Sequence, residues 1–168
     1  MRKMLLLAGL LSAAPTRAQP QIAPSLLEYA GRALARLMET VREQAIADGV
    51  RPMPPTVYRR LLGYFPDALL RQARYATGHT EGISLPALAF TYGDAAAMTI
   101  GDIILFRDER SAAGDIRLWA HELTHMMQYQ RWGIDGFAAR YVRDSGAVER
   151  EAYGNADRFM EWHGKATH

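Results

Sequence analysis

The chain has 168 residues, enough for one domain with a buried core, and its hydrophobic content of 49% favours a globular fold. It contains no cysteine, which excludes disulfide bonds, a lipid-modified cysteine anchor and thiolate metal ligands. The formal net charge is +2 and the sequence pI is near 9.0, but the basic excess lies in the first eighteen residues. We therefore do not expect a nucleic-acid partner.

Residues 1–18 are ordered like a secretory signal peptide. Arg2 and Lys3 precede an apolar run over residues 4–11, and Thr16-Arg17-Ala18 offers a cleavage site of small residues. The apolar run is too short to span a bilayer. Cleavage would remove three positive charges and change the formal net charge from +2 to −1. We expect an exported bacterial protein, periplasmic or secreted, without a stable membrane anchor; the alternative is an N-terminal helix of the mature fold.

Residues 19–51 are predicted to hold one amphipathic helix. Ser25 can begin it, with Glu28 at the spacing of a capping box, and Asp48-Gly49 can end it. Apolar residues recur along one face, from Leu26 to Val41. This face packs either on the core or against a protein partner. Residues 19 to about 50 could also be a removable pro-segment.

The remaining residues, 52–168, are predicted to form an α+β domain of zincin type. Prolines make a stiff connector at its start, and two short helices are expected at Thr56–Leu62 and Asp67–Tyr75. Strands are expected at Ile83–Tyr92 and Ala97–Arg107, joined through Gly93-Asp94. They would make a small antiparallel sheet ahead of the next helix.

The second predicted strand contains Gly101, which interrupts the alternation of apolar residues. We expect a β-bulge or a close backbone approach at this position. The strand is either a sheet edge that pairs with an extended peptide or an ordinary support for the following helix.

The next predicted helix, Ile116 to Trp132, carries the motif His121-Glu122-Leu123-Thr124-His125. Asp115 can cap it and Gly133 can stop it. Residues four apart lie on one helical face, so the two imidazoles can converge on one zinc ion. Zinc lowers the pKa of a neighbouring water to about 7, and Glu122 can take the proton released as that water attacks a carbonyl. This chemistry is typical of a metallopeptidase.

A third ligand must come from elsewhere, because a catalytic zinc site has three protein ligands. Residues 148–160 have helical period, and Glu149 falls within their apolar face, whereas Glu151 falls on the far side. A carboxylate in an apolar stripe is costly unless it is paired or bound to metal. We predict Glu149 as the third ligand, with Glu151 in reserve, and note that Glu149 could instead pair with a buried Arg or Tyr.

Several stretches together resemble a bacterial zincin-like family, domain of unknown function 4157, which is often found in contractile injection-system proteins. They are Met98–Phe106, Leu118–His125 with Gln128-Tyr129, Arg131–Gly133, Gly136-Phe137, Tyr141-Val142 and Glu149–Tyr153. The resemblance covers roughly residues 52–160.

The resemblance implies a gluzincin arrangement, with His121, His125 and Glu149 as zinc ligands and Glu122 as catalytic base. Tyr153 stands where the related pattern has an Asp that supports the ligands. The resemblance leaves Asp157 or Asp144 as possible substitutes.

Donors that could stabilise the oxyanion of a transition state are Tyr129, Tyr141, Tyr153 and His163, and the sequence does not choose among them. We predict an exported zinc metallopeptidase acting on a peptide or protein substrate. The alternative is a non-catalytic, zinc-stabilised binding or accessory module of a cell-envelope or secretion assembly, docked through the helix over residues 25–48.

Overall fold

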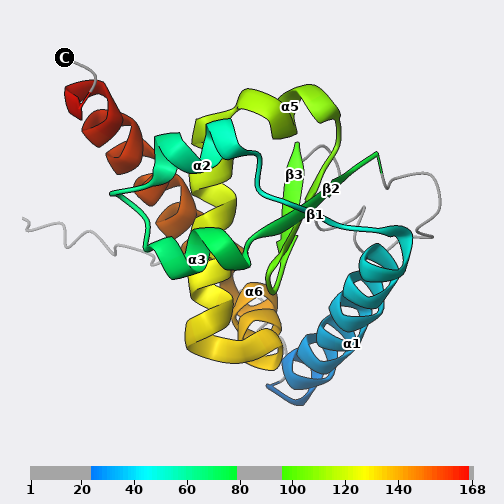
Figure 1. The fold of residues 1–168 in the computed structure, drawn as a ribbon. Coiled ribbons are helices and arrows are strands. Elements are labelled where there is room, and N and C mark those ends of the chain that lie inside the picture. The colour runs from blue at the N-terminus through cyan, green and yellow to red at the C-terminus, as the bar shows by residue number, and fades with distance from the viewer. Residues whose placement is uncertain (1–23, 79–95, 167–168) are drawn as a thin grey trace, which may run out of the picture.

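The computed structural model describes residues 24–78 and 96–166, which form a mixed α/β fold of mostly helix around a small sheet (Figure 1). The predicted signal peptide, the Ile83–Tyr92 strand and its Gly93-Asp94 connection lie outside the described residues. None of the described helices is long and apolar enough to cross a membrane.

The sheet has four strands in the order β1-β2-β4-β3. They are β1 (Arg51–Pro52), β2 (Arg74–Thr77), β3 (Ala97–Ile100) and β4 (Ile103–Phe106). The outer pairs are antiparallel, but β2 and β4 are parallel, so the expectation of an antiparallel sheet is wrong for the central pair. The cause is that β3 and β4 form a hairpin, and only its second strand pairs with β2.

The turn of this hairpin is where the prediction of one long strand fails. Gly101 has a φ of 62° and makes a tight turn with Asp102, rather than a bulge. A Cβ at Gly101 would lie 3.3 Å from Nε of Arg42, so the expected close approach is real but is made to a side chain. Asp102 accepts hydrogen bonds from Arg42 on one oxygen and from Arg74 on the other.

Both faces of the sheet are covered, since all four residues of β4 are buried. The buried hydrophobic residues form two core clusters, and alternate residues of β4 pack into different ones. Ile104 and Phe106 belong to the first cluster, and Ile103 and Leu105 belong to the second. The first cluster contains the short helices α2 (Pro55–Leu61), α3 (Asp67–Gln72) and α5 (Glu109–Gly114). The second contains the long helix α1 (Pro24–Asp48).

Helix α1 confirms the helix predicted from Ser25, and its predicted apolar face packs on the core except at its start, where Leu26 is exposed. Met38, Val41 and Ala45 are buried in the second cluster with Ile100 and the later part of the chain. Close packing is possible at Gly31, where a Cβ would lie 3.2 Å from Cα of Ala139. The residues on the outer face include Leu26, Tyr29 and Ile46, which are exposed.

The two predicted short helices are present as α2 and α3, but α3 ends at Gln72 rather than at Tyr75. Residues 74–77 form β2 instead, because Tyr75 and Ala76 bury their side chains on opposite faces of the sheet. Helix α5 was not expected. Its cap, Asp108, accepts a hydrogen bond of 2.8 Å from the backbone N–H of Ser111.

Helix α6 (Ile116–Ala166) is broken at two residues with non-helical backbone, Gly133 and Asp144. We call the three parts the first segment (116–132), the second (134–143) and the third (145–166). The predicted stop at Gly133 is therefore confirmed, and the predicted helix over residues 148–160 lies in the third segment. The two breaks reverse the chain, so that the orange and red third segment returns beside the yellow-green first (Figure 1).

Candidate metal centre

The first segment of α6 holds the motif in a buried setting. Asp115 accepts a hydrogen bond of 2.9 Å from the backbone N–H of Leu118, as predicted for a cap. Trp119 is fully buried, and its indole N–H donates to the carbonyl of Ala112 in α5. This packing fixes the rotation of the segment, and all five motif residues are buried.

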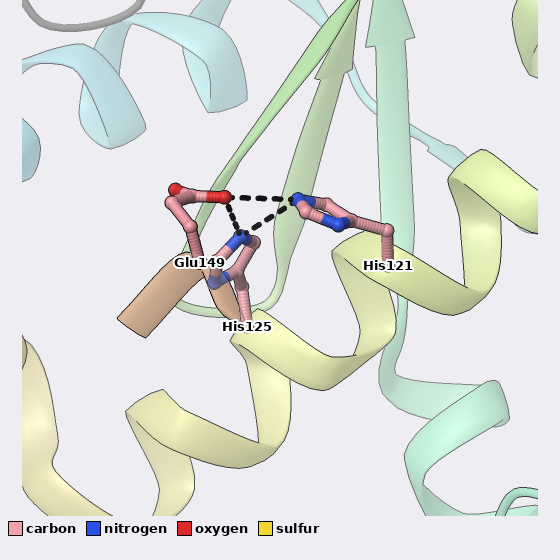
Figure 2. A group of neighbouring side chains, drawn as sticks. All are labelled: His121, His125 and Glu149. Carbon is pink, nitrogen blue, oxygen red and sulfur yellow. Dashed lines mark hydrogen bonds and ion pairs between the residues drawn. The ribbon is translucent and has the colours of Figure 1, made fainter. Parts of the chain in front are cut away.

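The three predicted metal ligands lie together (Figure 2). Nε2 of His121 is 3.1 Å from Nε2 of His125, and these atoms lie 3.3 Å and 3.5 Å from Oε2 of Glu149. Zinc bonds of 2.0–2.1 Å in a tetrahedron place any two ligand atoms about 3.3–3.4 Å apart. The three donor atoms therefore form a triangle of the size that one zinc ion requires, and the group could hold a metal.

The structure separates the two candidate glutamates of the third segment. Glu149 reaches the histidines, while its other oxygen, Oε1, accepts a 3.1 Å hydrogen bond from the hydroxyl of Tyr141. Glu151 turns away and accepts from Gln128 and Arg131. The expected pairing of Glu149 with a Tyr is thus also present, on the oxygen that the histidines do not use.

The three clustered side chains shift one another's pKa. Burial alone would raise the pKa of Glu149, but its hydrogen bonds with His121 and His125 outweigh burial and hold the pKa far below the ordinary range. Burial alone would lower the pKa of His125, but the carboxylates of Glu149 and Glu122 outweigh it and raise the pKa. Both shifts express the attraction between the carboxylates and the imidazole rings.

Glu122, the predicted base, is buried and is held by the edge strand of the sheet. The hydroxyl of Thr99 in β3 lies 2.7 Å from Oε2 of Glu122 and 3.1 Å from its backbone carbonyl oxygen. The hydroxyl of Tyr129 in turn donates to the carbonyl of Thr99 over 3.1 Å. The carboxylate is thereby fixed to β3.

The residues proposed to replace the supporting Asp do not do so. Asp157 pairs with Arg117, and Asp144 accepts from the backbone N–H of Ala147 at the start of the third segment. Nδ1 of His121 is buried and has no hydrogen-bond partner among the described residues. The ring of Tyr153, at the position where the related pattern has Asp, lies against His121 with centroids 4.4 Å apart.

The four candidate oxyanion donors differ in their position relative to the predicted metal ligands. Tyr141 contacts Glu149, and Tyr153 contacts His121 while 52% exposed, so both lie at the ligands. Tyr129 is buried with its hydroxyl on Thr99, and burial raises its pKa well above the ordinary value. His163 stacks on Phe159 near the end of α6.

Sequence reasoning missed the supporting roles of Thr99, Gln128 and Tyr141. Gln128 follows His125 by three residues, which puts both on one helical face, and this spacing was a usable signal. Thr99 and Tyr141 gave no comparable signal, because their partners are 23 and 8 residues away in the chain.

The fold and the site define a mixed α/β protein with a candidate His, His, Glu metal centre. The family model that matches the chain is described as the eCIS core domain, and the match covers residues 52–133. This confirms the resemblance to domain of unknown function 4157 over those residues, which include His121 and His125 but not Glu149. No curated protein and no solved structure matches the chain.

Proposed function

We propose that this protein is a zinc-binding accessory component of an extracellular contractile injection system. The observation that carries the proposal is that the eCIS core match spans the sheet and the helix that supplies two of the three clustered donors. Two imidazoles and a carboxylate are a donor set that zinc favours. The metal would join the first segment of α6 to the third segment. The third segment lies after residue 133, where the family match ends.

Zinc binding is tested by metal analysis of the purified protein with a matched pair of variants. Glu149→Gln and Glu151→Gln remove one negative charge each, two residues apart on one helix. We expect one zinc per chain in the wild type and in Glu151→Gln, and loss of zinc in Glu149→Gln. Equal zinc content in both variants would contradict the assignment of Glu149.

Association with the injection system is tested through the outer face of α1, where Leu26 and Tyr29 are exposed. We propose that this face meets the assembly. The tagged protein should sediment with contractile particles purified from the producing bacterium, and Leu26→Glu with Tyr29→Glu should abolish this without lowering the thermal stability. Particles that lack the wild-type protein would rule out the role. Export through residues 1–18 would place the encounter outside the cytoplasm.

Peptide-bond hydrolysis is the second candidate function, and the buried Glu122 beside the ligands favours it. When bound, zinc would polarise a substrate carbonyl and activate water. Glu122 would take the proton of the attacking water and pass it to the leaving amine, and Thr99 would hold the carboxylate in place. A site that serves only to join helices has no need of this carboxylate.

Glu122→Gln separates the two uses of the metal. We expect the variant to keep its zinc and to lose cleavage of a mixed-peptide library by a factor of about 10² or more, because general-base catalysis contributes about 10²–10⁴. Cleavage that is unchanged in the variant would exclude Glu122 as the base. A wild-type protein that holds zinc and cleaves no peptide would exclude hydrolysis, and the accessory role would remain as the proposed function.

A further inference from the structure

Gln128 lies fully buried between the two parts of α6 that supply the ligands. Its Oε1 is 2.8 Å from Nδ1 of His125, and its Nε2 is 3.0 Å from the carbonyl oxygen of Val148. The same Nε2 is 3.0 Å from Oε2 of Glu151, whose other oxygen accepts from Arg131 over 2.6 Å. One amide thus contacts a ligand, the residue before another ligand, and a charged pair.

The orientation of this amide is determined by its neighbours. A backbone carbonyl and an ionised carboxylate can only accept hydrogen bonds, so the end facing Val148 and Glu151 must be the NH₂ group. The two N–H bonds of that group are both used. The end facing His125 must then be the carbonyl oxygen, which can only accept.

The carbonyl of Gln128 in turn determines the tautomer of His125. Its partner Nδ1 must carry a hydrogen, so a neutral ring has its lone pair on Nε2, the atom that faces His121 and Glu149. His121 is constrained in the opposite sense. Its Nε2 faces the lone pair of His125 and the carboxylate of Glu149, which can only accept, so a neutral His121 in the metal-free protein carries its hydrogen on Nε2. Gln128 therefore leaves His125, and not His121, with a lone pair directed toward the other two ligands.

We propose that Gln128 is a positioning residue that presets His125 as a metal ligand and ties the helix of Glu149 to it. The inference rests on the proposed metal site. Gln128 acts on both ligands, through the tautomer of His125 and through the carbonyl of Val148, which precedes Glu149. The Glu151–Arg131 pair keeps the amide in the required orientation from the side away from the site.

The first test uses metal-free protein, so that its outcome does not depend on metal binding. Nitrogen NMR at alkaline pH should show neutral His125 with its hydrogen on Nδ1 and neutral His121 with its hydrogen on Nε2. In Gln128→Met, whose thioether is only a weak acceptor, His125 should lose most of this preference. A wild-type His125 protonated on Nε2, or an unchanged tautomer in Gln128→Met, would overturn the inference. A wild type that fails to bind zinc would instead remove the proposed function.

The second test measures zinc affinity by competition with a chromophoric chelator. Gln128→Met should bind about 10–100-fold more weakly, the usual loss when the partner of a ligating His is removed. The double variant Gln128→Glu, Glu151→Gln restores an acceptor at His125 but cannot donate to the carbonyl of Val148, so it should recover only part of the loss. Gln130→Met is the control and should stay near the wild type, because Gln130 is exposed on the same segment and donates to Gln72. Wild-type affinity in Gln128→Met would overturn the inference.

Discussion

Thr99 and Glu122 meet where the edge of the sheet contacts the first segment of α6. Both side chains are buried, and the hydroxyl of Thr99 donates a hydrogen bond to Oε2 of Glu122. A buried carboxylate is stable only with such a donor, since leaving it unsatisfied costs more than a neutral group would. The hydrogen bond from Thr99 holds the carboxylate of Glu122, the predicted base, in place. None of the three predicted metal ligands takes part in this hydrogen bond.

The effect of this pair on stability can be measured with two substitutions of similar size. Thr99→Val removes the hydroxyl and should lower the free energy of unfolding by about 1–3 kcal/mol, the cost of an unsatisfied buried acceptor. Thr99→Ser keeps the hydroxyl and should be less destabilising. Urea unfolding of the three proteins measures the difference, and equal destabilisation by Val and Ser would contradict the role of the hydroxyl.

Three elements meet at the hairpin turn of β3 and β4. Asp102 is bound by Arg42 of α1 and by Arg74 of β2, at distances of 2.7 Å and 2.6 Å. Helix α1 also covers one face of the sheet, with Met38 and Val41 buried there. Deleting α1 would expose this face, so the docking role of α1 is better tested by substitutions on its outer side than by removing the helix.

The turn also gives a pH dependence of stability. Burial alone would raise the pKa of Asp102, but the two guanidiniums outweigh it and lower the pKa below its ordinary value. A group with a lowered folded-state pKa stabilises the fold above its unfolded pKa, and this contribution is lost as the pH falls through the folded pKa. The loss therefore occurs below about pH 4.

Asp102→Asn should lower the free energy of unfolding by about 1–2 kcal/mol at neutral pH, allowing for the partial exposure of the group. Because the wild-type contribution disappears with protonation, the two proteins should converge in stability as the pH is lowered below 4. Denaturant unfolding from pH 7 to pH 3 measures this. A difference that stays constant over the range would show that Asp102 acts through packing rather than charge.

The molecule as a whole is arranged so that one metal ion would join distant parts of the chain. His121 and His125 belong to the first segment of α6, and Glu149 belongs to the third. Two breaks, at Gly133 and Asp144, turn the chain back between them. A ligand that binds only the folded state stabilises it in proportion to the logarithm of its concentration over its dissociation constant.

Zinc should therefore raise the thermal stability of the protein. At free zinc about 100 times the dissociation constant, the gain is about 2.7 kcal/mol, or roughly 5–11 °C in Tm for a chain of this size. Stripping zinc with a chelator should reverse it. His125→Ala should show no zinc-dependent shift in the same scanning calorimetry, and a shift equal to that of the wild type would place the metal elsewhere.

Local pattern in the sequence determined most of the helices, though not α5, and the residues that form the candidate metal centre. Helix α1, the start of α6 at Asp115 and its break at Gly133 follow from caps and from a period of 3.6 residues, which are short-range properties. The spacing of His121 and His125 on one face is of the same kind. The position of Glu149 in an apolar stripe was enough to prefer it to Glu151 as the predicted third ligand.

Only the tertiary structure decided how these parts meet. The parallel pairing of β2 with β4, and the assignment of residues 74–77 to a strand, depend on partners far away in the chain. The link from Thr99 to Glu122 and the three contacts of Gln128 depend on the reversal of α6. Such contacts leave no periodic trace, because they are selected by the space between elements rather than by the neighbours of each residue.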